Sequence, residues 1–481
     1  MHLQITFRIL GSLLMMFSVT LLVPLLWSFY YNDGVAFVFI NAFGYTFAAG
    51  GLLWVLFQHN KTEMRIKDGF LVTVLFYLTL GSFGSIPFAH EEGIGLSIPD
   101  ALFESFSGLT TTGATVITGL EDLPRSILFY RQQLQWLGGM GIIVLAVAIL
   151  PMLGVGGMQL YRAETPGPMK DSKLTPRIHQ TAVALWSIYV GLTVSCALAY
   201  KIAGMDLFDA ICHSFSTVAI GGFSTYDESI GYFDSSAIEA VAIVFMVVCG
   251  INFGLHFYAF KGGVKNYFSD DETRTYLLIL FSAALITSIS LILFEKYEGF
   301  DAVRVSVFTV VSMFTTTGFT TEDFTQWPNM LPYLIFFGSF SGACAGSTGG
   351  GMKVMRVLLI WKQGIREVFR IIHPNALFPV KINHRPISRG VIEAIWGFFS
   401  VYVILFLTLH LIMIGLGMDF VTAFSAVGAC LNNLGPGLGE VAYHYAGISD
   451  QAKMVLVLAM MLGRLEIFTL LVLFTFMFWR K

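Results

Sequence analysis

Charged side chains are scarce in this sequence. Of its 481 residues, 12% are Asp, Glu, Lys or Arg and 56% are hydrophobic. A soluble globular protein carries about 25% charged residues, so this chain has too few of them to cover a surface that faces water. The composition therefore excludes a soluble enzyme, a nucleic-acid-binding protein and a disordered protein, and it predicts a chain embedded in a membrane.

Cysteine is also rare, and no two cysteines are close in the sequence. The five of them lie in apolar stretches without a Cys-x-x-Cys pair or a histidine at ligand spacing: Cys196, Cys212, Cys249, Cys344 and Cys430. We interpret them as small core residues, not as a disulfide framework or a metal site.

Long runs without a charged residue mark the expected membrane spans. A spanning helix needs about 20 apolar residues. The runs cover 9–32, 34–60, 69–90, 132–161, 178–200, 240–260, 275–294, 324–352 and 394–418, and a tenth, 454–479, is interrupted only by Arg464 and Glu466. The sequence thus predicts an all-α polytopic membrane protein with ten transmembrane helices and both termini on one side.

The basic residues indicate which side that is. If the N-terminus is cytoplasmic, the inward-facing segments hold 21 Lys and Arg residues and the outward-facing segments hold 6. Basic residues are enriched in cytoplasmic loops, so both termini are expected in the cytoplasm.

Four outward segments contain a short apolar stretch followed by a turn that is rich in Thr or Gly. They read DALFESFSGLTTTGAT from Asp100, DAICHSFSTVAIGGFST from Asp209, SVFTVVSMFTTTGFTT from Ser306 and TAFSAVGACLNNLGPG from Thr422. Aligned on Gly113, Gly222, Gly318 and Gly435, they carry Ser107, Ser216, Ser312 and Ala429 six positions earlier. Each stretch lies between two long runs, so one structural unit occurs four times.

Short helices followed by glycine turns are suited to lining a cation pathway through a membrane. A 12-residue helix is about 18 Å long, so it enters the bilayer partway and has to turn back. Irregular backbone at that depth is tolerated where it lines a water-filled cavity, and rings of backbone carbonyls replace the hydration shell of a cation there. We therefore expect four re-entrant pore-helix/filter loops in fourfold pseudo-symmetric repeats. Two extra helices (1–67) precede the repeats, which cover 68–177, 178–274, 275–389 and 390–481.

Several stretches resemble the Trk/Ktr/HKT superfamily of potassium transporters, and the resemblance covers nearly the whole chain. They are ESFSGLTTTGATV, FYRQQLQWLGGMGIIVLAVAILP, HSFSTVAIGGFST, GACAGSTGGGMKVMR, LNNLGPGLGE and GRLEIFTLL. The resemblance implies that potassium, with no organic cofactor on this chain, binds to backbone carbonyls just before each filter glycine. Those carbonyls belong to Thr111, Thr112, Ile220, Gly221, Thr316, Thr317, Asn433 and Leu434. Because Ile220 and Gly221 replace a Thr pair and Pro436 follows the last glycine, the ring is expected to be only pseudo-symmetric.

The eighth run contains the segment GACAGSTGGGMK at 342–353. Each Gly costs about 1 kcal/mol in a helix relative to Ala, so we expect the span to break here. A phosphate-binding loop is excluded because Met352 stands where that motif needs Lys and no strand precedes it. Close helix packing through small residues remains an alternative. The resemblance favours an intramembrane gate made of Gly346, Ser347, Thr348, Gly349, Gly350, Gly351 and Lys353.

Arg464 lies about ten residues into the last run. An arginine at mid-membrane costs about 2.5–3.5 kcal/mol on insertion scales, so it is expected to face protein or water. An ion pair with Glu466 is disfavoured because residues two apart on a helix do not face each other. The resemblance implies that Arg464 projects into the pore beneath the filter, as part of the gate.

The longest inward connection, 353–389, carries eight basic residues. Binding to anionic lipid headgroups would explain them. The resemblance implies a homodimer seated on a cytosolic, nucleotide-binding regulatory ring of the TrkA type, with this segment as part of the dock.

These features predict potassium uptake across a bacterial inner membrane, through one gated, cation-selective pore per chain. The alternative is a proton- or sodium-coupled symporter. Such proteins place carboxylates or histidines at mid-membrane, where this chain offers only Glu466, His256 and His410. A membrane-embedded enzyme is disfavoured because no HExxH or GxSxG motif is present.

Overall fold

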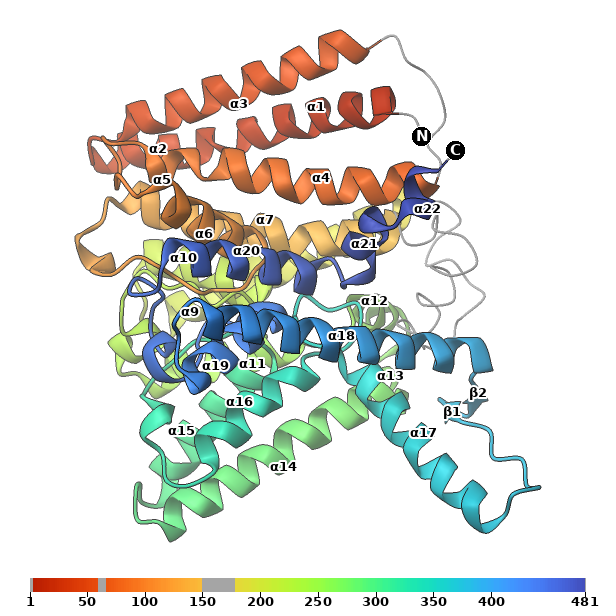
Figure 1. Ribbon diagram of the computed structural model, residues 1–481. Coiled ribbons are helices and arrows are strands. Elements are labelled where there is room, and N and C mark those ends of the chain that lie inside the picture. Colours follow the sequence, from red (N-terminus) through yellow and green to blue (C-terminus); the bar gives the residue numbers. More distant parts are fainter. Residues whose placement is uncertain (1–2, 59–65, 149–177, 481) are drawn as a thin grey trace.

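The computed structural model describes residues 3–58, 66–148 and 178–480 (Figure 1). Part of the predicted span 132–161, and several of the basic residues counted above, lie outside these ranges. The helices of the N-terminal half are α1 (Leu3–Thr20), α2 (Leu22–Tyr31), α3 (Ala36–Phe57), α4 (Ile66–Gly84), α5 (Ile86–Ala89), α6 (Ile98–Leu109), α7 (Arg125–Ala148), α9 (Ile178–Ile202), α10 (Leu207–Ala219), α11 (Ser236–Cys249) and α12 (Phe253–Gly262).

The C-terminal half continues in the same way. Its helices are α13 (Lys265–Ser269), α14 (Asp271–Leu293), α15 (Gly299–Phe314), α16 (Leu331–Ser341), α17 (Val354–Ile372), α18 (Arg389–Gly415), α19 (Phe420–Asn432), α20 (Asp450–Arg464), α21 (Phe468–Leu471) and α22 (Phe476–Trp479). Two strands of two residues each, β1 (Lys381–Ile382) and β2 (Arg385–Pro386), pair antiparallel after α17.

The described helices confirm an all-helical, multi-pass membrane architecture. Six of them, counting continuous pairs once, are long and apolar enough to cross a bilayer. Two more crossings arise if each bent pair counts as one: α11 and α12 meet at 94°, and α20 is followed by a turn of 107°. The other two predicted runs are 132–161, described only in part, and 324–352, in which α16 ends after 11 residues.

Neither 240–260 nor 454–479 forms one continuous helix. The first helix ends at Gly250, and the Asn252 side chain caps α12 by accepting from the Gly254 N–H at 2.7 Å. The second ends at Arg464, and Glu466 and Ile467 take left-handed φ values of 56° and 55°. For a β-branched residue such as Ile467 this conformation is an outlier, and it turns the chain sharply.

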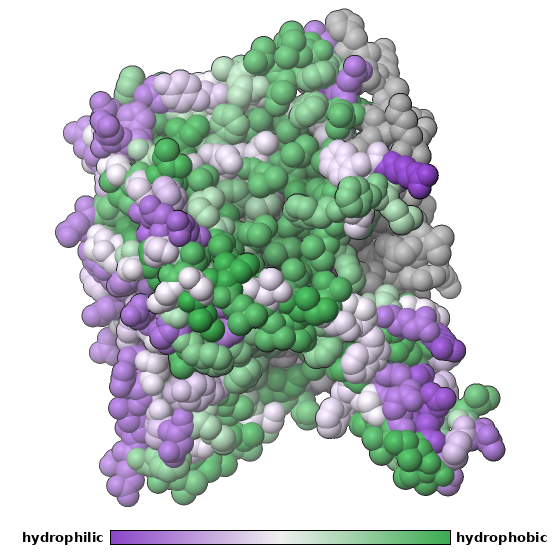
Figure 2. All heavy atoms as spheres, in the orientation of Figure 1, coloured by the Kyte–Doolittle hydropathy of each residue, from purple (hydrophilic) through white to green (hydrophobic). Residues whose placement is uncertain are grey.

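The outer surface supports this architecture. Figure 2 shows a broad hydrophobic band between two hydrophilic edges. Large apolar side chains point outward from the long helices, as Met16, Leu278 and Leu411 do with 65–68% of their surface exposed. The start of α1 and the end of α22 lie at the same end of the molecule (Figure 1).

The first two long helices touch each other through glycines. A Cβ on Gly11 of α1 would lie 2.6 Å from the Gly50 carbonyl oxygen of α3, and a Cβ on Gly50 would lie 2.8 Å from the Gly11 carbonyl oxygen. Small residues at a membrane helix contact allow backbones to approach this closely.

The four predicted short helices are present as α6, α10, α15 and α19, with 12 to 16 residues each. Each packs between the two helices that flank it in sequence and the helix that follows the short helix of another repeat. Thus α6 contacts α4, α7 and α20; α10 contacts α9, α11 and α7; α15 contacts α14, α16 and α11; and α19 contacts α18, α20 and α16. These contacts run in one cyclic order, which places the four short helices around a common centre.

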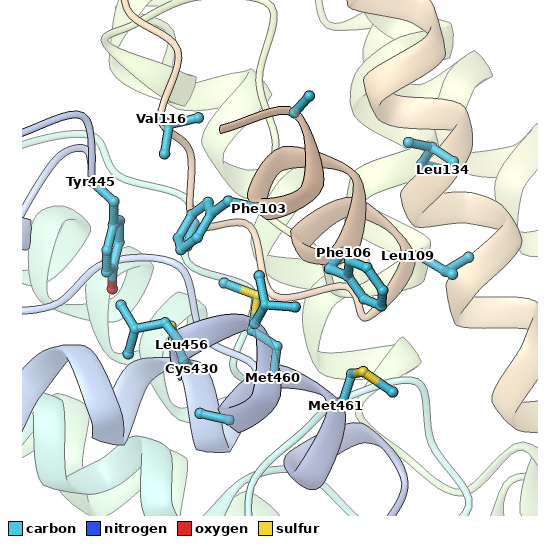
Figure 3. Close-up of a cluster of buried hydrophobic side chains, with 14 of the residues drawn as sticks. Phe103, Phe106, Leu109, Val116, Leu134, Cys430, Tyr445, Leu456, Met460 and Met461 are labelled. Atoms are coloured by element: carbon cyan, nitrogen blue, oxygen red, sulfur yellow. The ribbon is translucent and has the colours of Figure 1, made fainter. Parts of the chain in front are cut away.

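Apolar side chains fill the space around α6 (Figure 3). Phe103 lies against Tyr445 with ring centroids 5.4 Å apart, and Phe106 and Leu109 belong to the same buried cluster as Leu134 of α7 and Met460 of α20. Inside a bilayer, such contacts stabilise the helices through close van der Waals packing. This packing holds the C-terminal end of α6, and the turn after it, against two neighbouring helices.

Candidate functional site

All four short helices end in the same backbone conformation. The residue two positions before each glycine is left-handed, with φ of 53° at Thr111, 54° at Ile220, 68° at Thr316 and 54° at Asn433. The next N–H, one position before the glycine, donates to the carbonyl oxygen five residues back over 2.8–2.9 Å. This is the Schellman pattern that closes a helix C-terminus. Its acceptors are the residues aligned in the sequence repeat: Ser107, Ser216, Ser312 and Ala429.

The glycine itself is left-handed in three of the four turns. The φ values are 80° for Gly113, 79° for Gly222 and 83° for Gly318, a conformation that glycine adopts without steric cost. Gly435 does not share this positive φ, so backbone freedom does not explain the fourth glycine. The fourth position has no room for a side chain, because a Cβ on Gly435 would lie 2.7 Å from the Gly113 carbonyl oxygen.

The four turns contact one another in a closed ring. A Cβ on Gly113 would lie 2.1 Å from the Gly221 carbonyl oxygen, and one on Gly222 would lie 1.9 Å from that of Thr317. A Cβ on Gly318 would lie 2.7 Å from Cδ of Pro436, which follows Gly435, and Gly435 meets Gly113 as described above. The sequence repeats therefore meet in the order first, second, third, fourth and first again, with no room for side chains at the contacts.

Most of the expected filter carbonyls have no donor from the protein. Of the eight, the Gly221 oxygen accepts a hydrogen bond from Gln135 Nε2 at 2.7 Å, and Gln135 Oε1 accepts from the Phe223 N–H at 3.1 Å. Within the described ranges, none of the other seven oxygens accepts a hydrogen bond. Unpaired carbonyl oxygens gathered at one centre suit a cation that has shed water. Sequence reasoning missed Gln135, although three glutamines in an otherwise apolar run were a usable signal.

Threonine side chains brace the first and third turns internally, and an asparagine side chain links two turns. Thr110 and Thr112 share a hydroxyl hydrogen bond of 2.8 Å, and Thr315 and Thr317 share one of 2.7 Å. Asn433 Nδ2 donates to Thr112 Oγ1 at 3.1 Å, which joins the fourth turn to the first.

The glycine-rich loop at 342–353 interrupts its span as predicted, between the end of α16 and the start of α17. It is hydrogen-bonded to three of the four repeats. The Gly350 N–H donates to Thr316 Oγ1 at 2.7 Å, the Gly351 N–H donates to the Asn432 carbonyl at 2.9 Å, and Thr348 Oγ1 donates to the Val218 carbonyl at 2.9 Å.

Both ends of the loop are bound to one carboxylate. Oε1 of Glu272, which is 2% exposed, accepts from the Ala345 N–H at 2.7 Å and the Met355 N–H at 3.2 Å. The break between α11 and α12 also binds the loop, since the Cys344 N–H donates to the Gly250 carbonyl at 2.9 Å. Sequence reasoning did not identify Glu272, which stands at the charged start of an apolar run.

Arg464 connects the glycine-rich loop to the remaining repeat, the first. Its guanidinium is 3% exposed, and it donates to the Thr348 carbonyl at 3.2 Å and to the Gly138 carbonyl of α7 at 2.9 Å. As expected, it does not pair with Glu466, which instead binds Arg356 of α17 at 2.7 Å. Lys353 is 6% exposed, and its Nζ donates to the Gly349 carbonyl within the loop. The structure thus brings the expected gate residues together beside the ends of the short helices.

The remaining candidates do not form a proton or metal site in the described part of the chain. His256 is hydrogen-bonded to the Tyr267 hydroxyl at 2.8 Å, and His410 lies among the rings of Phe406, Phe420 and Phe424. No group of three or more His, Cys, Asp or Glu residues suited to a metal ion occurs among the described residues. All five cysteines are buried, as predicted for small core residues.

Comparison with known proteins shows similarity along the whole chain. A family described as "TrkH: Cation transport protein" matches residues 35–481. The chain is 57% identical to the Trk system potassium uptake protein TrkH of Halomonas elongata and 39% identical to TrkG of Escherichia coli, covering 99–100% of each protein. The crystal structure of the potassium transporter TrkH from Vibrio parahaemolyticus superimposes with a TM-score of 0.93 at 51% identity, and 100% of both chains is covered.

Proposed function

Since the chain belongs to the TrkH family of cation transport proteins, we propose that it takes up potassium across the bacterial inner membrane. The ion passes through one cation-selective pore per chain. The relatives compared above are named potassium uptake proteins. A membrane transport protein also accounts for the apolar, charge-poor composition of the chain.

The pore in this proposal is the centre of the ring formed by the four glycine turns. The observation that carries it is the closed cyclic contact of Gly113, Gly222, Gly318 and Gly435 with the neighbouring turns. Potassium as substrate would be held by the carbonyls of Thr111, Thr112, Ile220, Thr316, Thr317, Asn433 and Leu434. The Gly221 carbonyl belongs to the same set, because its oxygen has a second lone pair besides the one that accepts from Gln135. The four repeats in our proposal keep the boundaries expected from the sequence, with ten crossings in all.

The gate in this proposal is the loop 342–353 together with Arg464. Hydrogen bonds hold the loop against the second, third and fourth repeats, and Arg464 connects it to the first. A buried positive charge at that place opposes the passage of another cation. Opening requires that the loop leave these partners.

The topology we propose places both termini in the cytoplasm. The excess of basic residues in the inward segments and the position of the start of α1 and the end of α22 at the same end of the molecule support it. The segment 353–389 would then face the cytoplasm, where we propose that a homodimer docks on the nucleotide-binding regulatory ring.

A coupled symporter remains the second candidate, and its residues are poorly suited. Glu466 is bound to Arg356, and His256 is bound to Tyr267 and the Val248 carbonyl. Proton carriers at mid-membrane need to exchange protons with the path. Glu466 and His256 have protein partners instead, and His410 is enclosed by the rings of Phe406, Phe420 and Phe424.

Ion flux into liposomes separates these possibilities. Purified full-length protein should carry rubidium or potassium down its gradient, faster than sodium and with no change of internal pH. Obligatory proton or sodium movement would favour the symporter. A failure to move rubidium with or without a cytosolic partner would refute the pore.

A further inference from the structure

An ion pair lies buried beside the first two glycine turns. Arg131 Nε and Glu104 Oε1 are 2.8 Å apart, and the two side chains are 1% and 0% exposed. Glu104 belongs to the short helix α6 and Arg131 to the long helix α7. Burying two charges costs free energy, which is offset only when additional hydrogen bonds satisfy both groups. The hydrogen-bond partners of this pair therefore show which segments it fixes in place.

The carboxylate binds the segment that leaves the first turn. Its oxygens accept from Thr115 Oγ1 at 3.0 and 3.1 Å, and Oε2 accepts from the Val116 N–H at 3.1 Å. Arg131 Nη2 reaches the same hydroxyl, Thr115 Oγ1, at 3.1 Å. Thr115 stands two residues after Gly113, so both charges meet immediately beyond the ring.

The guanidinium also binds the segment that leaves the second turn. Arg131 Nη1 donates to the Ser224 carbonyl at 3.0 Å, and the guanidinium carbon lies 4.2 Å from the ring centroid of Phe223. Phe223 and Ser224 follow Gly222 directly. One side chain therefore fixes the first and second turns relative to each other, at the contact where Gly113 meets the Gly221 carbonyl.

The other turns are held by different means. Nine positions before the glycine, where the first repeat has Glu104, the second has His213, whose Nε2 lies 2.9 Å from Ser224 Oγ. The third and fourth repeats have Thr309 and Ala426 there. Their exit segments are bound by hydroxyls from other positions: Ser312 Oγ donates to the Phe319 carbonyl and Ser425 Oγ to that of Leu438.

On the basis of the proposed filter, we propose that Glu104 and Arg131 are positioning residues that determine ion specificity, by setting the separation of the first two turns. A sodium ion is smaller than potassium, so discrimination requires that the ring resist contraction on every side. Arginine suits this role because its planar fork directs donors to three acceptors at once, whereas lysine offers a single point charge.

The test uses three variants of the full-length protein in liposomes: Glu104→Gln, Thr115→Val and Arg131→Lys. Each should lower the ratio of rubidium to sodium uptake roughly tenfold or more, on the scale of one lost hydrogen bond to a charged group. Rubidium uptake itself should persist. Glu239→Gln is the matched control, because Glu239 is also buried and bound to an arginine, Arg304 at 3.0 Å, with no hydrogen bond to a turn. Its uptake ratio should stay at the wild-type value.

Thr115→Val keeps the test decisive if the charge variants do not fold, because it removes one hydroxyl and no charge. Wild-type uptake ratios in the folded variants would overturn the inference, as would an equal fall in Glu239→Gln. If the wild type is selective and Gly113→Ser is not, yet the three variants retain selectivity, this inference fails while the filter stands. If the wild type shows no preference for rubidium, the proposed filter fails first.

Discussion

Arg464 donates a hydrogen bond from Nη1 to the carbonyl oxygen of Thr348 over 3.2 Å. The hydroxyl of the same threonine donates to the Val218 carbonyl at the end of α10. Thr348 thus joins the buried guanidinium of Arg464 to the second repeat. The same guanidinium also donates to the Gly138 carbonyl of α7. The loop is held from opposite sides by hydrogen bonds that contribute about 0.5–1.5 kcal/mol when both groups are neutral and about 1.5–3 kcal/mol when one is charged, as in the bond from Arg464.

Replacing Arg464 by alanine should raise rubidium flux several-fold in the absence of a cytosolic partner. The change removes a repelling charge and the link between Thr348 of the loop and Gly138 of α7. Tracer uptake into liposomes measures the effect. Arg389→Ala is the control, since the Arg389 side chain is 89% exposed and, among the described residues, pairs with Glu393 on its own helix alone. Unaltered flux in Arg464→Ala would reduce the arginine to a packing role.

Glu272→Ala should also increase basal flux, because the N–H groups of Ala345 and Met355 lose their shared acceptor and the ends of the loop are freed. Glu272→Gln retains an acceptor oxygen and should fall between the alanine variant and the wild type. Limited proteolysis of the loop, together with rubidium uptake, checks both effects. Equal behaviour of the alanine variant and the wild type would show that this carboxylate does not restrain the gate.

Serine at the filter glycines should weaken discrimination against sodium, and more at Gly113 than at Gly435. Gly113 has both a left-handed φ of 80° and the closer contact, 2.1 Å against 2.7 Å for the added Cβ. Gly447→Ser is the control, because a Cβ there would meet no atom within 4 Å. The sodium-to-rubidium uptake ratio is the measurement. Selectivity that survives in both filter variants would contradict the filter assignment.

Gly50→Leu should destabilise the protein by about 1–3 kcal/mol, the usual cost of overpacking, because the added side chain meets the backbone of α1. Gly51→Leu places the same side chain one residue away, where a Cβ would meet no atom within 4 Å, and should leave stability unchanged. Thermal unfolding in detergent compares the two. If both variants melt together, the Gly11–Gly50 contact does not hold the N-terminal helices.

The fourfold repeat could be predicted from the sequence because particular residue types recur at matching positions of each copy. Gly113, Gly222 and Gly318 occupy backbone positions that other residues rarely adopt, so the motif and the turn coincide. The break at 342–353 was predictable for a similar reason, since glycines weaken a helix wherever they cluster.

The bends at 250–252 and 465–467 were not predictable in this way. Hydropathy measures how apolar a run is, and it does not detect where the backbone turns within it. Ile467 is left-handed although nothing in its residue type favours that conformation. Tertiary partners decide such positions: Glu466 beside it binds Arg356, more than a hundred residues away in the sequence. The same holds for Glu104, Gln135 and Glu272, whose roles depend on which backbone groups the fold brings to them.

The most direct test of the account is a crystal structure of the protein soaked in rubidium, read by anomalous scattering. We predict anomalous density at the centre of the ring, between the carbonyl oxygens that precede Gly113, Gly222, Gly318 and Gly435, and its loss when sodium replaces rubidium. Density that lies elsewhere along the molecule, with none between the four turns, would contradict the claim that these turns bind the transported ion.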